Sequence, residues 1–391
     1  MKKYIYMDNA ATTPVKKEVL EEMLPYFSEH YGNASSVYSL GSESKMAIEK
    51  SREQVAAALG ADKSEIFFTA GGSESDNWAI KGVAYKHREK GNHIITTKIE
   101  HHAVLHTCEY LEKQGFEVTY LDVDSDGLID LDDLKNAIKD TTILISIMFA
   151  NNEIGTIQPI KEIGQIAKER GILFHTDAVQ AIGSIEIDVN DLNVDLLAIS
   201  AHKFFGPKGV GALYIRKGVR LDNLISGGGQ ERSKRAGTEN LASIVGMGKA
   251  IELAYENFQE HSKNLTELRD YAINKIENTF DYVKLNGHRT KRLAGNINFS
   301  FEFIEGESLL LMLDMNGIAA SSGSACTSGA LDPSHVLLAI GLSHEIAHGS
   351  LRLSLSDFNT KEEIDYVVEK LVGIVDRLRH MSPLYEKIKG A

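Results

Sequence analysis

A lysine at position 203 stands where it could act as an amine nucleophile. It follows residues 194–199, a short apolar stretch with one Asp, and it precedes a Gly-Pro-Lys-Gly turn. The stretch is typical of a buried parallel strand, and open α/β sheets bind ligands just beyond such strand ends. Partial desolvation there favours the neutral amine, which can attack a carbonyl. An ordinary surface lysine is the alternative, and these residues alone favour that alternative.

A second segment, Gly71-Gly72-Ser73, has the composition of an anion-binding turn. It separates a predicted strand at 65–69 from a predicted helix. Free backbone N–H groups and the helix dipole at such a junction favour a phosphate. The alternative is an ordinary capped helix, with Ser73 as the N-cap and Asp76 three residues later. Capped helices far outnumber phosphate sites, so the segment indicates little by itself.

Two titratable side chains follow other predicted strands. His101 comes after the strand at 93–97 and could stack on a planar ring or transfer protons, although a helix-terminus histidine fits equally well. Asp177 ends the strand at 172–177, where a carboxylate needs a cation or a donor such as a protonated heteroaromatic nitrogen. A helix N-cap or a buried salt bridge would also satisfy Asp177.

Two residues nearer the C-terminus complete the candidate chemistry. Cys326 lies in a loop of small polar residues, 321–329, and the lack of apolar neighbours favours a reactive thiol over a structural one. Arg352 alternates with Leu351 and Leu353 in a predicted strand. It therefore faces away from the core and can bind a carboxylate through two parallel hydrogen bonds. A surface ion pair is the alternative for Arg352.

No metal site is expected. His102 and His106 are the only histidines one helical turn apart in their cluster, and neither His101 nor Cys108 is an evident third ligand. Cys108 and Cys326 form no CxxC pair, so neither a disulfide framework nor a cysteine-rich zinc site is expected.

The elements that must position these residues follow an alternating order. Helices alternate with six predicted strands, which indicates a doubly wound, mostly parallel sheet; the strands lie at 65–69, 93–97, 143–149, 172–177, 194–199 and 210–216. A smaller α+β unit follows a long helical stretch at 240–278. Its elements are strands at 296–303 and 348–355 and helices at 306–316 and 361–379, and an N-terminal strand at 4–7 could join them.

Composition excludes several classes of protein. The 391 residues are 25% charged and 43% hydrophobic, which is ordinary for a globular enzyme of two domains. A net charge of −13 argues against nucleic acid or an anionic membrane as the main partner. The first residues include no apolar run long enough for a signal peptide or a membrane span, so a cytoplasmic location is expected.

Taken together, these segments resemble the cysteine desulfurases, pyridoxal-phosphate enzymes of the class V aminotransferase family and of fold type I. The motifs in order are YMDNAATTP, GNASSV, FTAGGSESDN, EHHAVL, NNEIGT, HTDAVQ, SAHKFFGPKG, GGGQERSKRAGTEN, SSGSACTSG and LRLSLS. The resemblance implies a large domain at 14–255, with a mostly parallel seven-stranded sheet. It implies a smaller α+β domain built from 1–13 and 256–391, which carries the cysteine loop.

The resemblance also implies a place for pyridoxal 5'-phosphate. Lys203 would hold it covalently, Asp177 would pair with its pyridinium nitrogen, and Gln180 would touch its ring hydroxyl. The residues around the phosphate would be Gly72, Ser73, Ser200 and His202, with Thr238 reaching in from the other subunit of a homodimer. The family is expected to have Ala-Thr where this chain has Gly72-Ser73, and Ser73 keeps the hydroxyl.

The remaining roles concern substrate and sulfur. His101 would stack on the ring and move protons, and Asn152 would contact cofactor or substrate. Arg352 would bind the substrate carboxylate, helped by Asn33, and Cys326 would accept the sulfur.

The implied reaction converts L-cysteine to L-alanine and leaves a persulfide on Cys326, for iron–sulfur cluster assembly or another sulfur-transfer pathway. The implied partners are L-cysteine, a second copy of the chain and a sulfur-acceptor protein such as an iron–sulfur scaffold. The acceptor itself stays open. Alternatives are a selenocysteine lyase or an aminotransferase of the same fold, or a non-catalytic protein that docks on sulfur-transfer partners.

Overall fold

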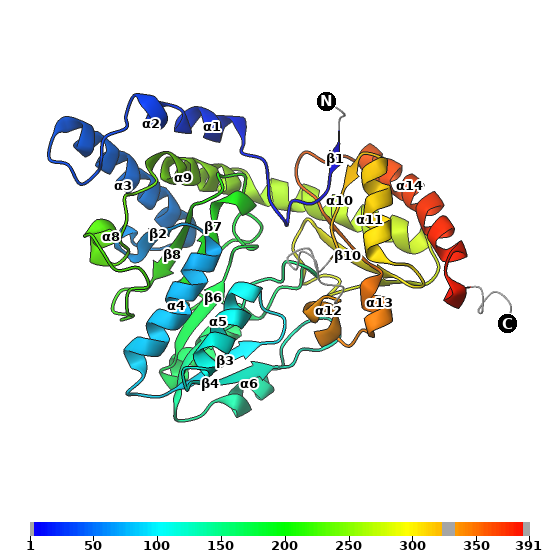
Figure 1. Cartoon of the computed structure of the whole chain (residues 1–391), viewed down its shortest axis with the longest axis horizontal. Coiled ribbons are helices and arrows are strands. Elements are labelled where there is room, and N and C mark those ends of the chain that lie inside the picture. Colours follow the sequence, from blue (N-terminus) through cyan, green and yellow to red (C-terminus); the bar gives the residue numbers. More distant parts are fainter. Residues whose placement is uncertain (1–3, 323–332, 386–391) are drawn as a thin grey trace.

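The computed structural model describes residues 4–322 and 333–385, which form a large α/β domain and a smaller α+β domain (Figure 1). The large domain is built on a seven-stranded sheet with the order β2-β8-β7-β6-β5-β3-β4. Its strands are β2 (Ile66–Thr69), β3 (His93–Thr97), β4 (Glu117–Leu121), β5 (Thr142–Ser146), β6 (Leu173–Asp177), β7 (Leu196–Ser200) and β8 (Gly211–Ile215).

One strand of this sheet, β8, runs against its neighbours. It pairs antiparallel with both β2 and β7, whereas the other neighbouring pairs are parallel. Only residues 201–210 connect β7 to β8, and they include the short 3₁₀ helix η2 (Ala201–Lys203). A parallel return would need a crossover of a dozen or more residues, so this short connection dictates an antiparallel pair. It also holds Lys203 at the end of β7.

Helices cover both faces of the sheet and bury its alternating side chains. On β7, Leu197 and Ile199 belong to one apolar core and Leu196 to another. The first core includes side chains of α3 (Ser39–Leu59), α7 (Ile160–Arg170) and α9 (Leu241–Tyr255), and the second those of α4 (Gly72–His87) and α5 (His102–Glu112). Strands buried on both faces in this way read as nearly continuous apolar runs. The remaining elements of this domain are α1 (Lys17–Met23), α2 (Pro25–Ser28), η1 (Lys63–Glu65), α6 (Leu131–Ala137) and α8 (Gln230–Ser233).

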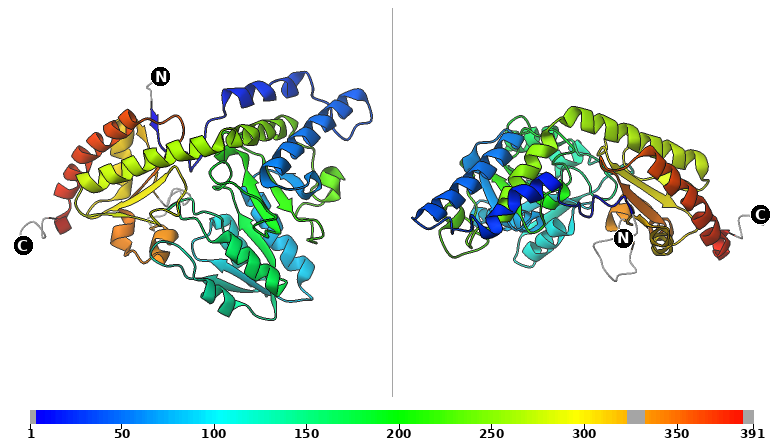
Figure 2. Two further views of the ribbon diagram at one scale, coloured as in Figure 1. Left: turned by 180° about the vertical axis from the view of Figure 1, so that it is seen from behind. Right: turned by 90° about the horizontal axis from the view of Figure 1, so that it is seen from above.

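The smaller domain has its own core beneath an antiparallel sheet, β12-β10-β9. Helix α10 (Phe258–Thr279) leads from the large domain to this unit and packs beside α14 (Lys361–His380) (Figure 2). The other elements are β9 (Val283–Leu285), β10 (Asn296–Phe301), α11 (Gly306–Met315), β11 (Ile318–Ala319), α12 (His335–Ala339), α13 (His344–His348) and β12 (Ser350–Ser354). The N-terminal strand β1 (Ile5–Tyr6) pairs with β11, and Met7 lies in the small-domain core.

Several elements differ from the expectations, and α6, β9, β11, α12 and α13 are among those that were not expected. Strand β4 was not expected, because this edge strand has an exposed Glu117 and half-buried centres instead of an apolar run. The helix expected at 240–278 is two helices, since Asn257 adopts a left-handed conformation with φ of 53° between α9 and α10. The strand expected at 143–149 ends earlier, at Ser146. Among the described residues, no helix is both long and apolar enough to span a membrane.

Candidate active site

Lys203 lies beyond the carboxyl end of β7 and contacts the N-terminal segment. Its Nζ donates to the carbonyl oxygens of Ala10 and Ala11 at 2.6 and 2.8 Å. The Nε2 of Gln180 donates to the same Ala10 carbonyl at 3.0 Å. The structure therefore brings Lys203 and Gln180 together on the Ala10 carbonyl, a group that no sequence pattern singled out.

Asp177 ends the adjacent strand β6 and is 6% exposed. Its Oδ1 accepts a hydrogen bond from the backbone N–H of Val179 at 2.9 Å. Burial raises the pKa of Asp177 to about 6, while the Val179 N–H and the Lys203 ammonium act in the opposite direction. A buried carboxyl that few donors satisfy fits a protonated ring nitrogen, since such a group costs free energy until it meets a cation.

The N-terminus of α4 has backbone N–H groups that no N-cap side chain engages, although the preceding Gly71 N–H donates to the Thr69 hydroxyl at 3.3 Å. Gly71 is the N-cap, with φ of 149°, and no side-chain oxygen caps the helix. The expectation that Ser73 is the N-cap is wrong, because the helix already begins at Gly72. A Cβ on Gly72 would lie 2.7 Å from Cγ2 of Val179, and one on Gly71 would lie 3.6 Å from Oγ of Ser200. These contacts place Val179 and Ser200 against the turn, at a helix N-terminus of the kind that binds phosphates.

An acidic side chain in the first turn of α4 is neutralised from the loop before α9. The Glu74 carboxylate accepts two hydrogen bonds from Arg235, at 2.8 and 3.1 Å, and one from the Ala70 N–H at 2.9 Å. The ion pair offsets a negative charge that would otherwise oppose an anion at this helix terminus. No pattern in the sequence indicated this pairing.

Two histidines flank the lysine, and both are held neutral. Burial, followed by the charge of Lys203, lowers the pKa of His101 to about 4 and that of His202 to about 4. His101 is the N-cap of α5, where its Nδ1 accepts from the Ala103 N–H at 3.1 Å. That bond assigns the ring proton of neutral His101 to Nε2. His202 lies 3.1 Å from the Thr12 hydroxyl through its Nδ1.

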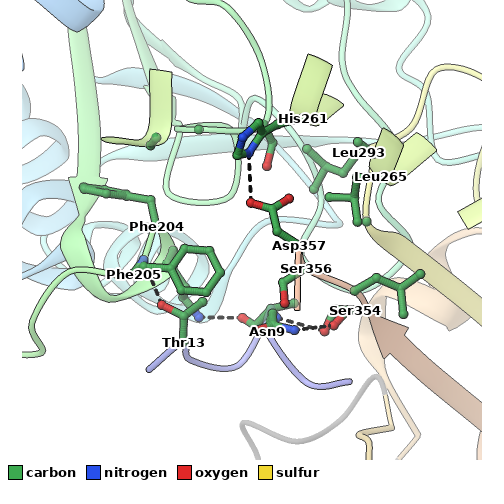
Figure 3. A pocket seen from close by; sticks show the side chains of 18 of the residues that line it. Asn9, Thr13, Phe204, Phe205, His261, Leu265, Leu293, Ser354, Ser356 and Asp357 are labelled. Atoms are coloured by element: carbon green, nitrogen blue, oxygen red, sulfur yellow. Dashed lines mark hydrogen bonds and ion pairs between the residues drawn. The ribbon is translucent and has the colours of Figure 1, made fainter. Parts of the chain in front are cut away.

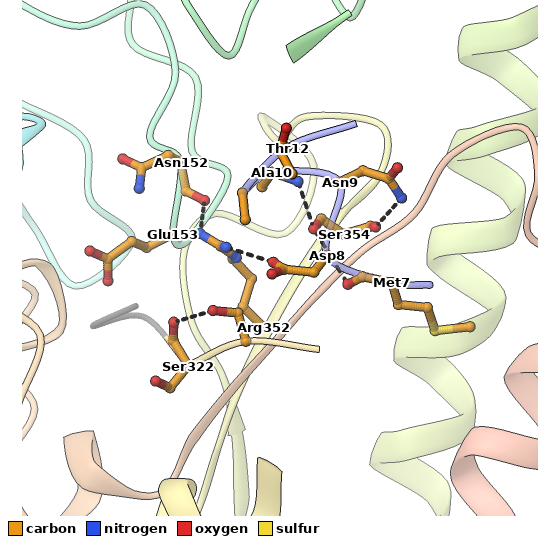
Figure 4. A network of polar contacts seen from close by, with 12 residues as sticks. Met7, Asp8, Asn9, Ala10, Thr12, Asn152, Glu153, Ser322, Arg352 and Ser354 are labelled. Carbon is orange, nitrogen blue, oxygen red and sulfur yellow. Dashed lines mark hydrogen bonds and ion pairs between the residues drawn. The ribbon is translucent and has the colours of Figure 1, made fainter. Parts of the chain in front are cut away.

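Arg352 on β12 is 3% exposed and already has a counter-ion (Figure 4). Its Nη2 donates to Oδ1 of Asp8 at 2.8 Å, and its Nη1 donates to the backbone oxygen of Asn152 at 3.1 Å. Its Nε is buried with no hydrogen-bond partner among the described residues. An unsatisfied guanidinium donor fits an incoming carboxylate. The sequence missed Asp8, although it lies in the quoted YMDNAATTP segment.

Three predicted residues are not brought to this centre within the described part of one chain. Asn33 is exposed in the connection between α2 and α3. Figure 1 shows α2 at the end of the large domain away from α11 and α14 of the small domain. Thr238 is exposed in the loop before α9. Cys326 lies outside the described residues.

A cavity between the two domains adjoins the lysine but covers little of this site (Figure 3). Its lining includes Lys203, Gln180 and the ion pair of His261 with Asp357, whose atoms are 2.9 Å apart. The other predicted cofactor and substrate residues lie outside its lining, so the geometry of the strand ends, and not this cavity, defines the candidate site.

Imidazole rings also gather on α5 and α12. The His102 ring lies 4.9 Å from that of His106 and 4.7 Å from that of His335. Within residues 4–322 and 333–385, no three histidine, cysteine or acidic side chains are grouped so that they could hold a metal ion.

This chain is similar to proteins of a known family. The family model of the class-V aminotransferases matches residues 5–367, so the chain belongs to that family. A cysteine desulfurase IscS of Clostridium botulinum is 64% identical over 388 residues, covering 99% of this chain and 98% of the relative. One of Methanosarcina thermophila is 63% identical over 388 residues, covering 98% of this chain and 95% of the relative.

Two solved structures are similar as well. A NifS-like protein has a TM-score of 0.90 at 43% identity, covering 96% of this chain and all of the other. The protein SspA, in complex with cysteine, has a TM-score of 0.81 at 42% identity, covering 91% and 99%. The particular activity within the family is that of a pyridoxal-phosphate-dependent cysteine desulfurase, as the sequence predicted. The predicted fold, a mostly parallel seven-stranded sheet with a smaller α+β domain, is confirmed.

Proposed function

We propose that the residues around Lys203 remove sulfur from L-cysteine and that Cys326 accepts it. The observation that carries this assignment is the meeting of three strand-end features: the Lys203 amine, the buried Asp177 carboxyl and the uncapped start of α4. Pyridoxal phosphate, when bound, supplies an electron sink for the substrate's α-carbon. Lys203 holds it, Asp177 keeps the ring nitrogen protonated, and Gly72, Ser73, Ser200 and His202 surround its phosphate.

The same proposal assigns the substrate side. The guanidinium of Arg352 binds the substrate carboxylate, and its unsatisfied buried Nε supports this role. Asn152, whose backbone oxygen holds Arg352, lies within reach of cofactor or substrate. His101 stacks on the ring and moves protons through Nε2, because Nδ1 is engaged by the Ala103 N–H.

Sulfur transfer needs a nucleophile that reaches the substrate's sulfur. The thiolate of Cys326 attacks that sulfur, an S–S bond forms and the Cβ–S bond of the substrate breaks. The carbon skeleton takes up protons and leaves as alanine, and the persulfide remains on Cys326. Small polar neighbours in the sequence support a reactive thiol at this position. The acceptor of the persulfide is a protein such as an iron–sulfur scaffold, within the cytoplasm.

Replacing Cys326 separates sulfur transfer from cofactor binding. We expect Cys326→Ser to keep the visible absorption of bound cofactor and to lose alanine and persulfide formation, because a hydroxyl is a weak nucleophile towards sulfur. Alanine release and mass spectrometry of the protein after addition of L-cysteine measure both products. The assignment fails if Cys326→Ser makes alanine at the parent rate.

The chain's other cysteine provides the control. Cys108 is fully buried, and burial raises the pKa of its thiol. Cys108→Ala is preferable to serine there, since a hydroxyl in this apolar core would lack a partner. It should match the parent in alanine and persulfide formation. A persulfide found on Cys108 of the parent would contradict the role of Cys326.

The active species in this proposal is a two-fold homodimer. An arm formed by α1, α2 and α3 exposes large apolar side chains, which supports an interface there; they include Leu24 (54% exposed), Phe27 (63%), Tyr31 (66%), Val37 (99%) and Met46 (65%). Thr238 is exposed and would complete the partner's phosphate site, and Asn33, on the same arm, would reach the partner's substrate. Sedimentation at assay concentration tests this, and active monomers would contradict it.

The domain boundaries belong to the proposal too: 14–255 for the large domain, and 1–13 with 256–391 for the small one. Val19 and Ile251 belong to a large-domain core, whereas Met7 and Ala272 belong to the small-domain core, which supports the division.

A further inference from the structure

A second buried carboxyl lies near Asp177 and has no role in the reaction as described above. Asp76 is on α4, one turn beyond the phosphate-binding start of the helix, and it is 1% exposed. Asp177 lies close enough to act on Asp76 electrostatically, as does the buried Glu100. Carboxyl groups crowded together away from water cannot all be ionised, so at least one must hold a proton.

A histidine and a serine continue from Asp76 into the sheet. His175 on β6 stands beside Ser146 on β5 in the register of the two strands, and its Nδ1 lies 2.9 Å from the serine Oγ. Its Nε2 lies 3.5 Å from Oδ1 of Asp76. Among the described residues, neither that nitrogen nor that oxygen has a hydrogen-bond partner. Two unsatisfied buried atoms facing each other require a proton between them.

The surroundings decide which of the three carboxyls is ionised. Asp177 has the Val179 N–H to stabilise its charge, together with the Lys203 ammonium in the protein without cofactor or the protonated ring nitrogen when the cofactor is bound. Glu100 accepts from Thr97 at 2.8 Å and from the Met148 N–H at 3.0 Å, and burial still raises its pKa to about 8. Asp76 has no such donors in the part of the chain that the structure describes, and burial with the charges of Asp177 and Glu100 raises its pKa well above the usual range. Burial also lowers the pKa of His175 to about 3, so the imidazole is neutral.

We propose that Asp76 is a positioning residue that stays protonated and donates its proton to Nε2 of His175, while Nδ1–H of His175 donates to Ser146. This arrangement satisfies both orphaned atoms and leaves Asp177 as the single anion behind the ring nitrogen. The inference rests on the proposed function, because the role of Asp177 towards the ring belongs to it.

The consequence concerns the proton on the cofactor's ring nitrogen. An ionised Asp76 would strengthen the proton affinity of Asp177, which would then compete with the ring for the same proton. A neutral Asp76 removes that competition. The Asp76–His175–Ser146 chain therefore determines the pH range over which the bound cofactor keeps its ring proton.

Asp76→Asn tests the protonation state directly, since an amide has the shape of a protonated carboxyl and can donate to His175 from the same place. Infrared difference spectroscopy of parent minus variant at neutral pH should show the loss of one protonated-carboxyl band. Asp191→Asn, at an exposed surface pair, should lose none. A parent that loses only an ionised-carboxylate band on Asp76→Asn overturns the proposal.

The visible absorption of the bound cofactor gives a second readout. Because no charge is removed, the pH profile of Asp76→Asn should lie within about half a pH unit of the parent's. A shift of about one unit or more would show that an ionised group had been lost, and would overturn the proposal.

A third variant decides the matter if Asp76→Asn does not fold. Ser146→Ala removes the hydroxyl that accepts from Nδ1–H of His175, so Nε2 of His175 becomes a weaker acceptor for the Asp76 proton. The infrared band of the protonated Asp76 carboxyl should therefore shift without disappearing. A band at the parent's frequency overturns the proposal. The role of Asp177 is tested separately by Asp177→Asn. An unchanged visible pH profile in that variant would refute the proposed function, whereas the carboxyl band still reports on Asp76.

Discussion

The two regions that we propose to bind anions differ in the protein groups that surround them. The start of α4 has backbone donors, no side-chain cap, and a Glu74 neutralised by Arg235. Arg352, on the other domain, holds an ion pair with Asp8 at 2.8 Å and keeps only its Nε unsatisfied. Among the described residues, the start of α4 has no resident carboxylate that would compete with an anion, whereas Arg352 already holds the Asp8 carboxylate, which would compete with one.

This difference matches the lifetimes that the two ligands require. A cofactor stays through many turnovers, and a helix terminus that no N-cap side chain engages suits tight, lasting binding of a phosphate. A substrate carboxylate must arrive and its product must leave in each turnover. A resident carboxylate beside the guanidinium stabilises the empty state and repels a second anion, so it lowers the net gain from binding.

The largest effect is expected at the guanidinium. Arg352→Gln should lower kcat/KM for L-cysteine by about 100-fold, because charge-assisted hydrogen bonds to a buried carboxylate contribute about 3 kcal/mol. Cofactor absorption should be retained. Steady-state kinetics measure the loss, with Arg289→Gln as the control, since Arg289 pairs with Glu277 at an exposed position. A loss of less than about threefold would remove Arg352 from the comparison.

A smaller effect is expected at the helix terminus. In Gly72→Ala the added Cβ would lie 2.7 Å from Cγ2 of Val179, whose N–H holds Asp177. Overpacking of about 1–2 kcal/mol should weaken cofactor binding by about tenfold. Titration of the cofactor into apoprotein measures this. Gly373→Ala is the matched control, because a Cβ there meets nothing within 4 Å; equal affinities in both variants would contradict the close fit.

The smallest and most diagnostic effect is expected at the counter-ion. Asp8→Asn keeps an oxygen near Arg352 but removes the charge, so L-cysteine should bind more tightly, with a KM lowered by about threefold. The melting temperature should fall, because the buried guanidinium loses its counter-ion in the free enzyme. An increased KM would show that Asp8 orients Arg352 and does not compete with the substrate.

The sequence predicted those parts of the site that belong to strand ends. Asp177 and Lys203 could be placed because each follows an apolar run and the carboxyl ends of parallel strands meet at one edge. The capped-helix interpretation put the start of the helix after β2 two residues too late, with Ser73 and not Gly71 as the cap, because backbone conformation and not residue type selected the cap.

What the sequence could not predict depends on long-range pairing. Asp8 meets Arg352 only because the segment after β1 lies along β12, and no local pattern encodes that approach. The edge strand β4 lacked an apolar run, and the break between α9 and α10 depends on the left-handed conformation of Asn257. The sequence pattern indicates only a helix-capping position for Asp76, because its partners His175 and Ser146 lie on two other elements.

The N-terminal segment also has a consequence for the order of events during synthesis. Ile5 and Tyr6 pair with β11, and the Ala10 N–H donates to the Ser354 hydroxyl, which is 344 residues further along the chain. The strands of the large domain leave the ribosome long before Ser354 does. The Ala10 and Ala11 carbonyls accept hydrogen bonds from the amine of Lys203. The lysine therefore receives these hydrogen bonds only after β12, near the end of the chain, has been translated and holds the N-terminal segment in place.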